Sequence, residues 1–296
     1  MIRSFDARSF PPEAVATAKA GRTVTVCLPA RDEEATVGTI VARVHETLVR
    51  RHAVVDELLV VDDGSGDATA ARAAAAGARV LSAAELVPTG ASPGKGQAMW
   101  AGLQASSGDI VAFCDADVRE FDPAFVLGLV GPLLADDGLG FVKGFYDRPV
   151  EGRDGRGGRV TELTARPLIA ALFPHLAALR QPLAGECAGR REVLEAVPFV
   201  GGYGVDLGLV IDVAARLGTA RIAQCDLGRR IHRNRSLDEL GAQALAVVQV
   251  ALQRGGARGA EALPWTSALQ RASGEVVPVT MTELPPQRSL GGRRTA

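Results

Sequence analysis

The sequence predicts an α/β protein in which a mostly parallel sheet is covered by helices. Strand-like and helix-like segments alternate through the first half of the chain, and the strand-like runs are continuously apolar. Such runs are typical of parallel strands, because both faces of a parallel sheet are buried. The 296 residues are 47% hydrophobic, which is enough for one large or two modest domains.

Each element of the first half has its own local signal. The expected strands are short apolar runs at residues 23–30, 57–67, 78–83 and 109–117. The helical segments expected after them are residues 34–51, an alanine-rich stretch that ends at residue 76, and residues 94–106 and 123–135. This order of strand, helix and strand is the pattern of a doubly covered parallel sheet.

The regular alternation of strands and helices ends after Val142, where a glycine- and arginine-rich stretch follows. Beyond it we expect helices at residues 160–180, 189–197, 203–217 and 236–254, and a short strand at residues 221–228. Ser236 and Glu239 form a capping box for the last helix. The chain therefore divides into a leader with one short helix (1–22), a first half (23–145), a more helical second half (146–255) and a tail (256–296).

Composition excludes several classes of protein. The net charge of −1 gives no general attraction to nucleic acid or membranes. The four cysteines are far apart and lack zinc-like spacing, which favours reduced thiols. No apolar run is long enough to cross a membrane, and the charges of Arg3, Asp6 and Arg8 argue against a signal peptide. We therefore expect a cytoplasmic protein.

Acidic and turn-forming residues follow the strands of the first half. They occupy residues 29–34 (PARDEE), 62–67 (DDGSGD) and 115–117 (DAD). Ligands of open parallel sheets bind beyond the carboxyl ends of the strands, so these three segments should face one crevice.

Asp115 and Asp117 are the most unusual of these acids. If strand geometry persists, both point to the same face, because side chains alternate along a strand. Two neighbouring carboxylates are costly unless a cation lies beside them. Taken alone, the triplet is also compatible with a solvated turn, and the other acidic strand ends favour the metal site.

Two common nucleotide motifs are absent. The glycines at 64 and 66 lack the third glycine of a dinucleotide fingerprint, since Thr69 stands there. The segment around Lys95 lacks the P-loop residues, since Thr89 and Gly96 occupy the decisive positions. A donor with a diphosphate, bound through Mg²⁺ or Mn²⁺, does fit, because these cations take carboxylate and phosphate oxygens together.

Four blocks of the first half, CLPARDEEATVG, LLVVDDGSGDAT, SPGKGQAMW and DIVAFCDAD, resemble the nucleotide-sugar half of GT-A glycosyltransferases. Blocks of the second half, VKGFYDRP, GGRVTELTARPL, QPLAGE, VPFVGGYGVDLGL and HRNRSLDELG, are similar to the retaining glucosyl-3-phosphoglycerate synthases of actinobacteria. The related mannosyl-3-phosphoglycerate synthases share the PLAGE-type block. The resemblance covers residues 23–255, so it implies a nucleotide-sugar half at 23–145 and an acceptor-binding half at 146–255.

The resemblance implies that Asp117 and His232 bind the metal and that Asp115 holds the ribose. Arginines surround His232, and nearby positive charge lowers the pKa of an imidazole, which favours the neutral form that ligates metals. An exposed histidine in a basic loop is the alternative. The other residues implied to bind the nucleotide sugar are Pro29, Ala30, Arg31, Glu33, Asp63, Lys95, Ala116 and Tyr203.

The acceptor should be a small, strongly anionic molecule, 3-phosphoglycerate by the resemblance. Gly158, Arg159 and Thr161 follow a glycine loop at the start of a helix, where amides and a guanidinium form an anion nest. A solvated linker is the alternative for this stretch. The resemblance adds Asn234 as a further acceptor contact.

The resemblance also implies how the reaction is catalysed. Leu183, Glu186 and Asp206 would line the sugar pocket, and Arg230 would bind the donor diphosphate bidentately. The acceptor hydroxyl would attack from the front face, and the leaving diphosphate oxygen would take its proton. Relatives often have glutamate where this chain has Asp206, which leaves the choice of donor sugar open.

The resemblance thus implies transfer of glucose from UDP-glucose, or another nucleotide-linked glucose, to the 2-hydroxyl of 3-phosphoglycerate. Three alternatives remain at this point. A mannosyl transfer from GDP-mannose would use the same architecture. A polyprenyl-phosphate glycosyltransferase would usually carry a membrane anchor, for which we find no signal. A nucleotide-sugar-binding protein without turnover would retain the same ligands. The apolar faces of residues 236–254 and 276–282 favour a homodimer.

Overall fold

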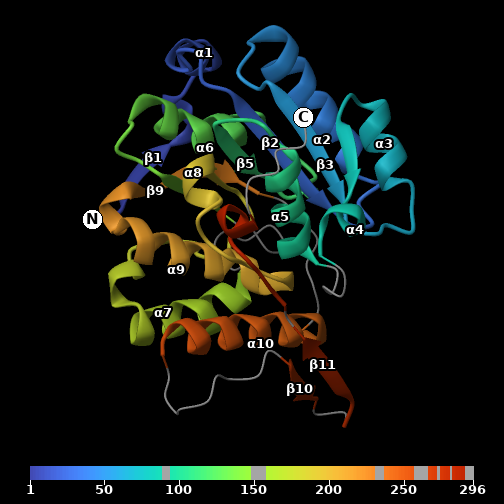
Figure 1. Cartoon of the computed structure of the whole chain (residues 1–296), viewed down its shortest axis with the longest axis vertical. Coiled ribbons are helices and arrows are strands. Elements are labelled where there is room, and N and C mark those ends of the chain that lie inside the picture. Colours follow the sequence, from blue (N-terminus) through green and yellow to red (C-terminus); the bar gives the residue numbers. More distant parts are fainter. Residues whose placement is uncertain are drawn as a thin grey trace.

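An eight-stranded sheet runs through the protein in the order β1-β9-β6-β7-β5-β2-β3-β4 (Figure 1). The computed structural model describes residues 1–88, 94–147, 158–230, 237–256, 266–271, 274–280 and 282–290. The strands of this sheet are β1 (Arg3–Asp6), β2 (Val24–Ala30), β3 (Glu57–Asp62), β4 (Arg79–Ser82), β5 (Ile110–Phe113), β6 (Phe141–Asp147), β7 (Cys187–Arg190) and β9 (Ile222–Arg229). The predicted α/β fold is confirmed.

Strand direction decides which chain segments meet at the edge of the sheet. Strand β7 is antiparallel to both of its neighbours, β5 and β6, whereas all other pairs in the sheet are parallel. Consequently β5 and β6 run in the same direction. The carboxyl ends of β2, β3, β5, β6 and β9 therefore share one edge of the sheet with the start of β7.

Helices cover both faces of the sheet. Val26 and Leu28 of β2 pack with α2 and α6 in one core, and Cys27 between them packs with α5, α9 and α10 in the other. The helices are α1 (Pro12–Ala18), α2 (Val37–Val44), α3 (Thr69–Ala75), α4 (Ala83–Leu86), α5 (Lys95–Ala105), α6 (Ala124–Ala135), α7 (Arg166–Leu172), α8 (Arg191–Leu194), α9 (Val205–Leu217) and α10 (Leu237–Arg254). Their arrangement gives the buried apolar runs predicted for the strands.

Short turns of helix complete the described secondary structure. The 3₁₀ turns are η1 (Ala7–Ser9), η4 (Pro174–Leu176), η5 (Gly202–Gly204), η6 (Thr219–Arg221) and η7 (Gln287–Leu290), and the π turns are η2 (His45–Arg51) and η3 (Thr161–Ala165). No helix in the described ranges is long and apolar enough to cross a membrane.

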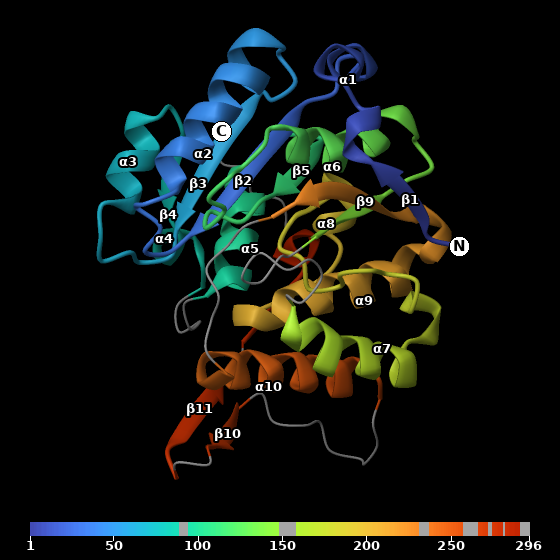
Figure 2. The same ribbon diagram turned by 180° about the vertical axis from the view of Figure 1, so that it is seen from behind.

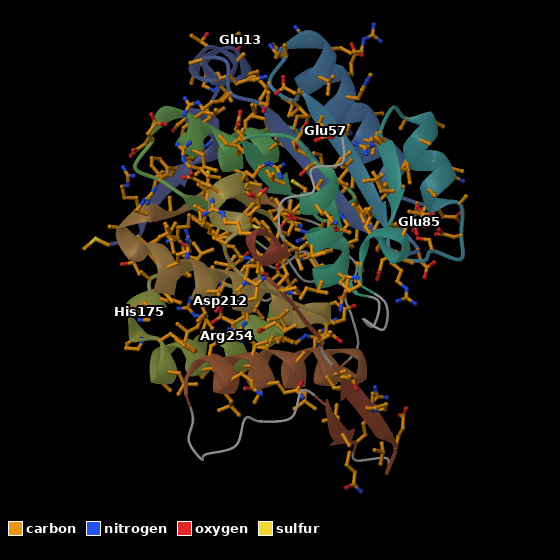
Figure 3. All side chains as sticks on the ribbon, viewed as in Figure 1. Glu13, Glu57, Glu85, His175, Asp212 and Arg254 are labelled. Atoms are coloured by element: carbon orange, nitrogen blue, oxygen red, sulfur yellow. The ribbon has the colours of Figure 1, made fainter. Side chains whose placement is uncertain are left out.

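The helices α7, α9 and α10 lie together on one side of the molecule in both views (Figures 1 and 2). The hairpin of β10 (Thr266–Gln270) and β11 (Val276–Thr280) extends beyond one end of α10. Asp212 of α9 and Arg254 of α10 point toward one another (Figure 3), joined by two hydrogen bonds of 2.8 and 3.0 Å. Arg254 also bonds Glu283, so this ion-pair network ties the end of the chain to α9 and α10.

The carboxy-terminal residues 282–290 pack along α5. Strand β12 (Glu283–Leu284) pairs with β8 (Phe199–Val200), and the amide of Gly201 donates to the Thr282 carbonyl at 2.7 Å. Nε1 of Trp100 in α5 donates to the Pro285 carbonyl at 3.0 Å. We call residues 282–290 the carboxy-terminal strap.

Several elements differ from the sequence-based expectation. The prediction of a helix over 189–197 is wrong in part, because β7 occupies residues 187–190 and only α8, four residues long, follows it. The helix expected over 160–180 ends at Leu172, before Pro174. Strand β6 and the edge strand β1, which pairs with β9, had no prediction.

Candidate active site

Charged side chains from five segments meet at the carboxyl edge of the sheet. Asp115 and Asp117 follow β5, Glu186 precedes β7, and Arg230 follows β9. The topology brings these segments together, since β7 lies between β5 and β6 and β9 lies beside β6. Lys95 at the start of α5 and Asp206 in the first turn of α9 complete the group. We call these residues, with Lys143, the charged cluster.

Arg230 lies at the centre of the charged cluster and is 3% exposed. Its Nη2 donates to Oδ2 of Asp115 at 2.8 Å and to Oδ1 of Asp117 at 2.6 Å. Its Nη1 donates to Oε2 of Glu186 at 3.1 Å and bonds the hydroxyl of Tyr146. One guanidinium thus joins three carboxylates from two chain segments.

The prediction that Asp115 and Asp117 point the same way rested on strand alternation, and that reason is wrong. Strand β5 ends at Phe113, so both aspartates lie beyond it. They converge because each binds Nη2 of Arg230. Among the described residues, the cation beside the carboxylate pair is the guanidinium of Arg230.

Lys95 links Asp115 to a fourth carboxylate of the cluster, that of Asp206. Its Nζ is 2.7 Å from Oδ1 of Asp115 and 3.1 Å from Oδ2 of Asp206. Lys143 of β6 approaches Asp206 from inside the protein, with 3.5 Å from its Nζ to Oδ1. Sequence analysis identified Lys95 and Asp206 but missed Lys143, which lies in an apolar stretch of sequence.

These contacts change the proton affinity of the cluster. Burial raises the pKa of Asp115, but the charges of Lys95 and Arg230 outweigh it and hold that pKa well below its ordinary value. Burial raises the pKa of Glu186 despite the nearby guanidinium of Arg230. Burial opposes the charge of Lys95, yet Asp115 and Asp206 raise the pKa of its ammonium well above its ordinary value. Asp115 and Lys95 are therefore ionised at neutral pH.

Gly185 of the PLAGE block makes the approach of Asp115 possible. A Cβ on Gly185 would lie 2.1 Å from Oδ1 of Asp115, which no side chain can tolerate. The resemblance to known sequences pointed to this block, and the packing supplies a physical reason for its glycine. Substitution there would displace the carboxylate that Lys95 and Arg230 bind.

Tyr146 and Gln181 also support the cluster, and sequence analysis missed both. The Gln181 side chain accepts from the Tyr146 amide at 3.3 Å and donates to the Tyr146 carbonyl at 2.5 Å. This pair of bonds fixes the backbone that presents the Tyr146 hydroxyl to Arg230. No local motif marks either residue, because the contact spans 35 positions of sequence.

The second acidic strand end, after β2 and β3, is built differently. Oγ of Ser65 donates to Asp62 at 2.5 Å and accepts from the amide of Asp32 at 3.0 Å. The Gly66 amide donates to Oδ1 of Asp32 at 2.8 Å. Neutral donors hold this loop together, whereas ammonium and guanidinium groups hold the charged cluster.

Asp63 is the buried acid of this second strand end. It is 8% exposed, and Nη1 of Arg31 lies 3.9 Å from its Oδ2. Burial raises the pKa of Asp63, while a hydrogen bond from the amide of Gly94 and the charge of Arg31 oppose that shift. The contact with Gly94 brings the second strand end to the start of α5, next to Lys95.

The remaining residues predicted to bind the nucleotide lie along the same edge. Pro29 and Ala30 end β2, and the Glu33 amide donates to Oγ1 of Thr69 at 2.8 Å. Ala116 is buried between the two aspartates, and its carbonyl accepts from Oγ1 of Thr36 at 2.6 Å. The backbone of Ala116 thus anchors the Asp-Ala-Asp triplet to the start of α2.

The predicted sugar pocket joins the start of α5 to the segment before α9. Leu183 packs on the core beneath α9, and Tyr203 is 46% exposed. The amide of Gly202 donates to Oε1 of Gln97 at 3.1 Å. Gly96 is required here, because a Cβ on it would lie 2.0 Å from the Val200 carbonyl.

The predicted acceptor residues are only partly described. Gly158 has a φ of +83°, which favours glycine, and its carbonyl accepts from the Glu162 amide at 2.9 Å. Thr161 is buried and Arg159 is exposed at the start of this helical segment. His232 and Asn234 lie outside the described residues, and so does the capping residue Ser236.

Asp117 fits a divalent cation. Within the described ranges, no group of three or more His, Cys, Asp or Glu side chains is arranged to hold a metal. The Asp117 side chain is 31% exposed, and among the described residues only its Oδ1 is hydrogen-bonded, to Arg230. Mg²⁺ and Mn²⁺ commonly take one or two protein carboxylates and complete their coordination with substrate phosphate, so this open carboxylate suits them.

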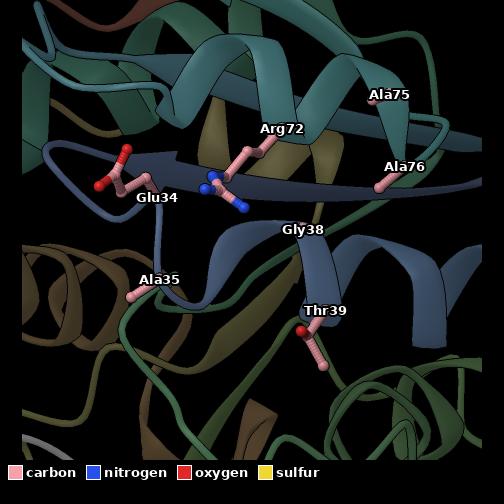
Figure 4. Close-up of a pocket in the computed structure, with 7 residues that line it drawn as sticks. All are labelled: Glu34, Ala35, Gly38, Thr39, Arg72, Ala75 and Ala76. Carbon is pink, nitrogen blue, oxygen red and sulfur yellow. The ribbon is translucent and has the colours of Figure 1, made fainter.

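A shallow pocket of about 380 Å³ lies apart from the cluster, between α2 and α3 (Figure 4). Arg72 extends from α3 toward α2, and the other lining residues are Glu34, Ala35, Gly38, Thr39, Ala75 and Ala76. None of the predicted site residues lines it. We therefore assign the chemistry to the charged cluster.

Comparison with known proteins gives a consistent result. The profile of glycosyl transferase family 2 matches residues 25–196. The glucosyl-3-phosphoglycerate synthase of Mycolicibacterium smegmatis is 51% identical over 245 residues, covering 81% of this chain and 80% of that protein. That of Mycolicibacterium paratuberculosis is 44% identical over 311 aligned positions, covering 98% and 92%.

Solved structures agree with the sequence comparison. A crystal structure of the Mycobacterium tuberculosis synthase in complex with Mn²⁺, UDP-glucose and phosphoglyceric acid has a TM-score of 0.87 and 44% identity, covering 98% of this chain and 99% of that chain. The same protein is also known with Mn²⁺, UDP and glucosyl-3-phosphoglycerate, at a TM-score of 0.84 and 44% identity over 98% of this chain and 100% of that one. The chain belongs to glycosyl transferase family 2 and, within it, to the glucosyl-3-phosphoglycerate synthases.

Proposed function

We propose that this enzyme transfers glucose from UDP-glucose to the 2-hydroxyl of 3-phospho-D-glycerate, giving glucosyl-3-phosphoglycerate and UDP. The names of its relatives support this reaction, and so do the complexes of the Mycobacterium tuberculosis synthase with donor, acceptor and product. Retention of the anomeric configuration belongs to the same proposal.

The charge balance of the cluster is the observation that carries the proposal. Four carboxylates, from Asp115, Asp117, Glu186 and Asp206, face three cations, from Lys95, Lys143 and Arg230. When all are ionised, the cluster is negative and repels a diphosphate. A bound divalent cation reverses that sign, which makes donor binding dependent on metal.

Asp117 would hold the metal, with His232 as the second protein ligand. When bound, Mg²⁺ or Mn²⁺ supplies Lewis-acid stabilisation of the leaving diphosphate. Complexes of the Mycobacterium tuberculosis synthase with each of these metals and UDP support the choice.

The donor would lie along the carboxyl edge of the sheet. Pro29, Ala30, Arg31, Glu33 and Asp63 would line the uracil and ribose. Asp115 and the backbone of Ala116 would hold the ribose. Lys95 and Arg230 would meet the diphosphate. Contacts to the glucose ring would come from a set of side chains on either side of α5, namely Leu183, Glu186, Tyr203 and Asp206.

The acceptor would bind beside the start of α7. Gly158, Arg159, Thr161 and Asn234 would hold its phosphate and carboxylate. The bond from the anomeric carbon to the diphosphate oxygen breaks, and the acceptor hydroxyl forms the new bond on the same face. The hydroxyl proton passes to the leaving diphosphate oxygen. The protein contributes by positioning both substrates and by stabilising the charge on the leaving group.

We also place the enzyme in the cytoplasm and expect a homodimer. All four cysteines are free and buried, which suits a reducing compartment. The hairpin β10–β11 beyond α10 is a candidate contact between two copies, since Val276 is 58% exposed. Light scattering at several protein concentrations tests the dimer.

The test of the reaction is product formation from 3-phosphoglycerate with UDP-glucose, GDP-glucose, ADP-glucose or GDP-mannose. Each donor is assayed with Mg²⁺, with Mn²⁺ and with EDTA. Glucosyl-3-phosphoglycerate that forms from a glucose donor only with metal supports the proposal. Preferred use of GDP-mannose would show a mannosyltransferase, and UDP binding without transfer would show a binding protein.

A further inference from the structure

Lys143 is a buried cation of the charged cluster to which the proposed reaction assigns no contact with a substrate. It lies in the middle of β6 and is 1% exposed. Phe141, two residues earlier on the same strand, packs in the core beneath α5 and α9. Side chains alternate along a strand, so Lys143 faces that side of the sheet as well. Its ammonium is therefore directed toward α9 rather than toward solvent.

Asp206 is the partner of this buried ammonium. Nζ of Lys143 lies 3.5 Å from Oδ1 of Asp206 and 3.5 Å from the Asp206 carbonyl oxygen. A buried charge is strongly unfavourable without a partner, so this contact fixes Lys143 and Asp206 relative to each other. The first turn of α9 also favours a carboxylate, because helix N-termini attract negative charge.

Asp206 is shared between two lysines that differ in access. Oδ2 of Asp206 meets Lys95, whose side chain is 17% exposed and which also binds Asp115. Oδ1 meets Lys143, which no ligand can reach because it is enclosed. An anion that engages Lys95 competes with Asp206 for that ammonium. Lys143 then remains as the cation that holds the Asp206 carboxylate.

The composition of the chain strengthens this interpretation. Lysine and arginine together number 33, but lysine occurs only at positions 19, 95 and 143. Two of those three lysines meet at one carboxylate, although arginine is used almost everywhere else. A compact ammonium fits the enclosed space beside Asp206, where a planar guanidinium needs a wider one.

We propose that Lys143 is a positioning residue, which keeps the Asp206 carboxylate oriented toward the donor sugar while Lys95 engages the diphosphate. This inference rests on the proposed transfer from a nucleotide sugar. It gives Lys143 a role in holding the donor sugar and no role in binding the nucleotide. Lys143 should therefore affect how the hexose is held, and it should leave the binding of the nucleotide unchanged.

The test compares Lys143→Met, Asp206→Asn and the double variant with the wild-type enzyme, all with Mg²⁺. UDP affinity is measured by calorimetry, and kcat and KM are measured for UDP-glucose at saturating 3-phosphoglycerate. For Lys143→Met we expect UDP affinity within twofold of wild type and a fall of at least tenfold in kcat/KM. The double variant should match Asp206→Asn within twofold, because both changes remove the same interaction.

A matched control is Lys19→Met, which breaks a partly buried pair with Asp56 at 2.8 Å that lies before β2, at the opposite end of that strand from the site. It should lower thermal stability, and it should not lower kcat/KM more than it lowers UDP affinity. If Lys143→Met does not fold, the double variant, which removes both buried charges, is measured in its place, and a loss of UDP affinity beyond that of Asp206→Asn would overturn the inference.

Equal losses of UDP affinity and of kcat/KM in Lys143→Met would overturn the inference. A double variant whose loss is the product of the single losses would do the same. Wild-type enzyme that transfers no glucose to 3-phosphoglycerate would instead refute the proposed function, so the two failures are distinguishable.

Discussion

Two of the acidic strand ends of this protein, DDGSGD and DAD, look alike in sequence and are held in opposite ways. In DDGSGD, Asp62 accepts from the hydroxyl and the amide of Ser65, and the Gly66 amide donates to Asp32 of the segment after β2. DAD after β5 is bonded by Lys95 and Arg230, and its Asp117 remains partly exposed. An acid whose partners are neutral donors shapes a loop, whereas an acid paired with side-chain cations can exchange them for a metal ion when a diphosphate engages those cations. The partners of an acidic cluster, more than its composition, indicate its role.

The largest effect that this comparison predicts is the loss of turnover in Asp117→Ala. We expect activity with metal to fall about a thousandfold, because several kcal/mol of charge stabilisation depend on the cation that Asp117 would hold. The fold should persist, as Asp117 is partly exposed. Asp62→Asn at the other strand end is the control and should retain activity within about threefold. Product formation measures the activity of both variants, and thermal unfolding measures their stability. Comparable losses of activity in Asp117→Ala and Asp62→Asn would contradict the difference between the two strand ends.

The second prediction concerns Arg230→Met, which leaves three carboxylates without their shared cation. Unfolding free energy should fall by about 3–5 kcal/mol, the usual cost of leaving buried charges unpaired. Mg²⁺ should restore part of this loss, since a cation can replace some of the missing charge. Urea unfolding with and without Mg²⁺ tests this. A metal effect no larger than in wild type would contradict the account of Arg230.

The third prediction uses the opposite pKa shifts of the two strand ends. Burial raises the pKa of Asp63, so its ionised form costs stability at neutral pH, and that cost disappears as the pH falls through the raised pKa. Asp63→Asn should therefore be more stable than wild type at pH 7, with the difference shrinking toward pH 4. UDP affinity should fall about tenfold if the carboxylate accepts a hydrogen bond from uracil.

The stability contribution of Asp115 should have the opposite pH dependence to that of Asp63. Burial opposes its ionisation, but Lys95 and Arg230 lower its pKa, so its stabilising contribution is complete above the ordinary pKa of an aspartate. That contribution is lost as the pH falls further, through the lowered value. Asp115→Asn should thus be less stable than wild type at pH 7. Urea titrations at several pH values that gave the same trend for both variants would refute the comparison.

The smallest effect is expected for Ser65→Ala, which removes the hydroxyl between Asp62 and the Asp32 amide. Stability should fall by about 1 kcal/mol, the usual net value of such bonds. Activity should stay within about twofold, since this loop would shape the site without contributing charge to it. Thermal unfolding and steady-state kinetics check both numbers, and a tenfold loss of kcat would assign the loop a larger role.

The sequence predicted the parallel part of the sheet well because its strands are local, continuous apolar runs. The helix begun by Lys95 and the acids after β5 were also found from local signals. Strand β7 was taken for the start of a helix because CAGR has no strand signature of its own. It forms a strand because β5 and β6 present open edges on either side of it. Such tertiary pairing overrides local propensity.

The same limit explains the missed residues of the site. Lys143 and Tyr146 lie on strand β6, which no local sequence pattern predicted. Gln181 contributes through its hydrogen bonds to the backbone of Tyr146. Their roles depend on contacts between distant segments. By contrast, Asp206 and Arg230 were predicted from the resemblance to a known family, whose sequence motifs include these two positions. Their roles in the reaction remain predictions that the variants above test.

The carboxy-terminal strap has a consequence for how the protein is made. Its Pro285 carbonyl accepts from the Trp100 indole, which precedes it by 185 residues, and its Thr282 carbonyl accepts from the amide of Gly201, two residues before Tyr203. At 5–20 residues per second, synthesis leaves Trp100 without this partner for about 10–40 s. During that interval one side of α5 and the pairing edge of β8 are uncovered, and they can associate with other newly made chains. A ribosome-bound chain that lacks residues 282–290 should therefore bind chaperones more than a chain that contains them.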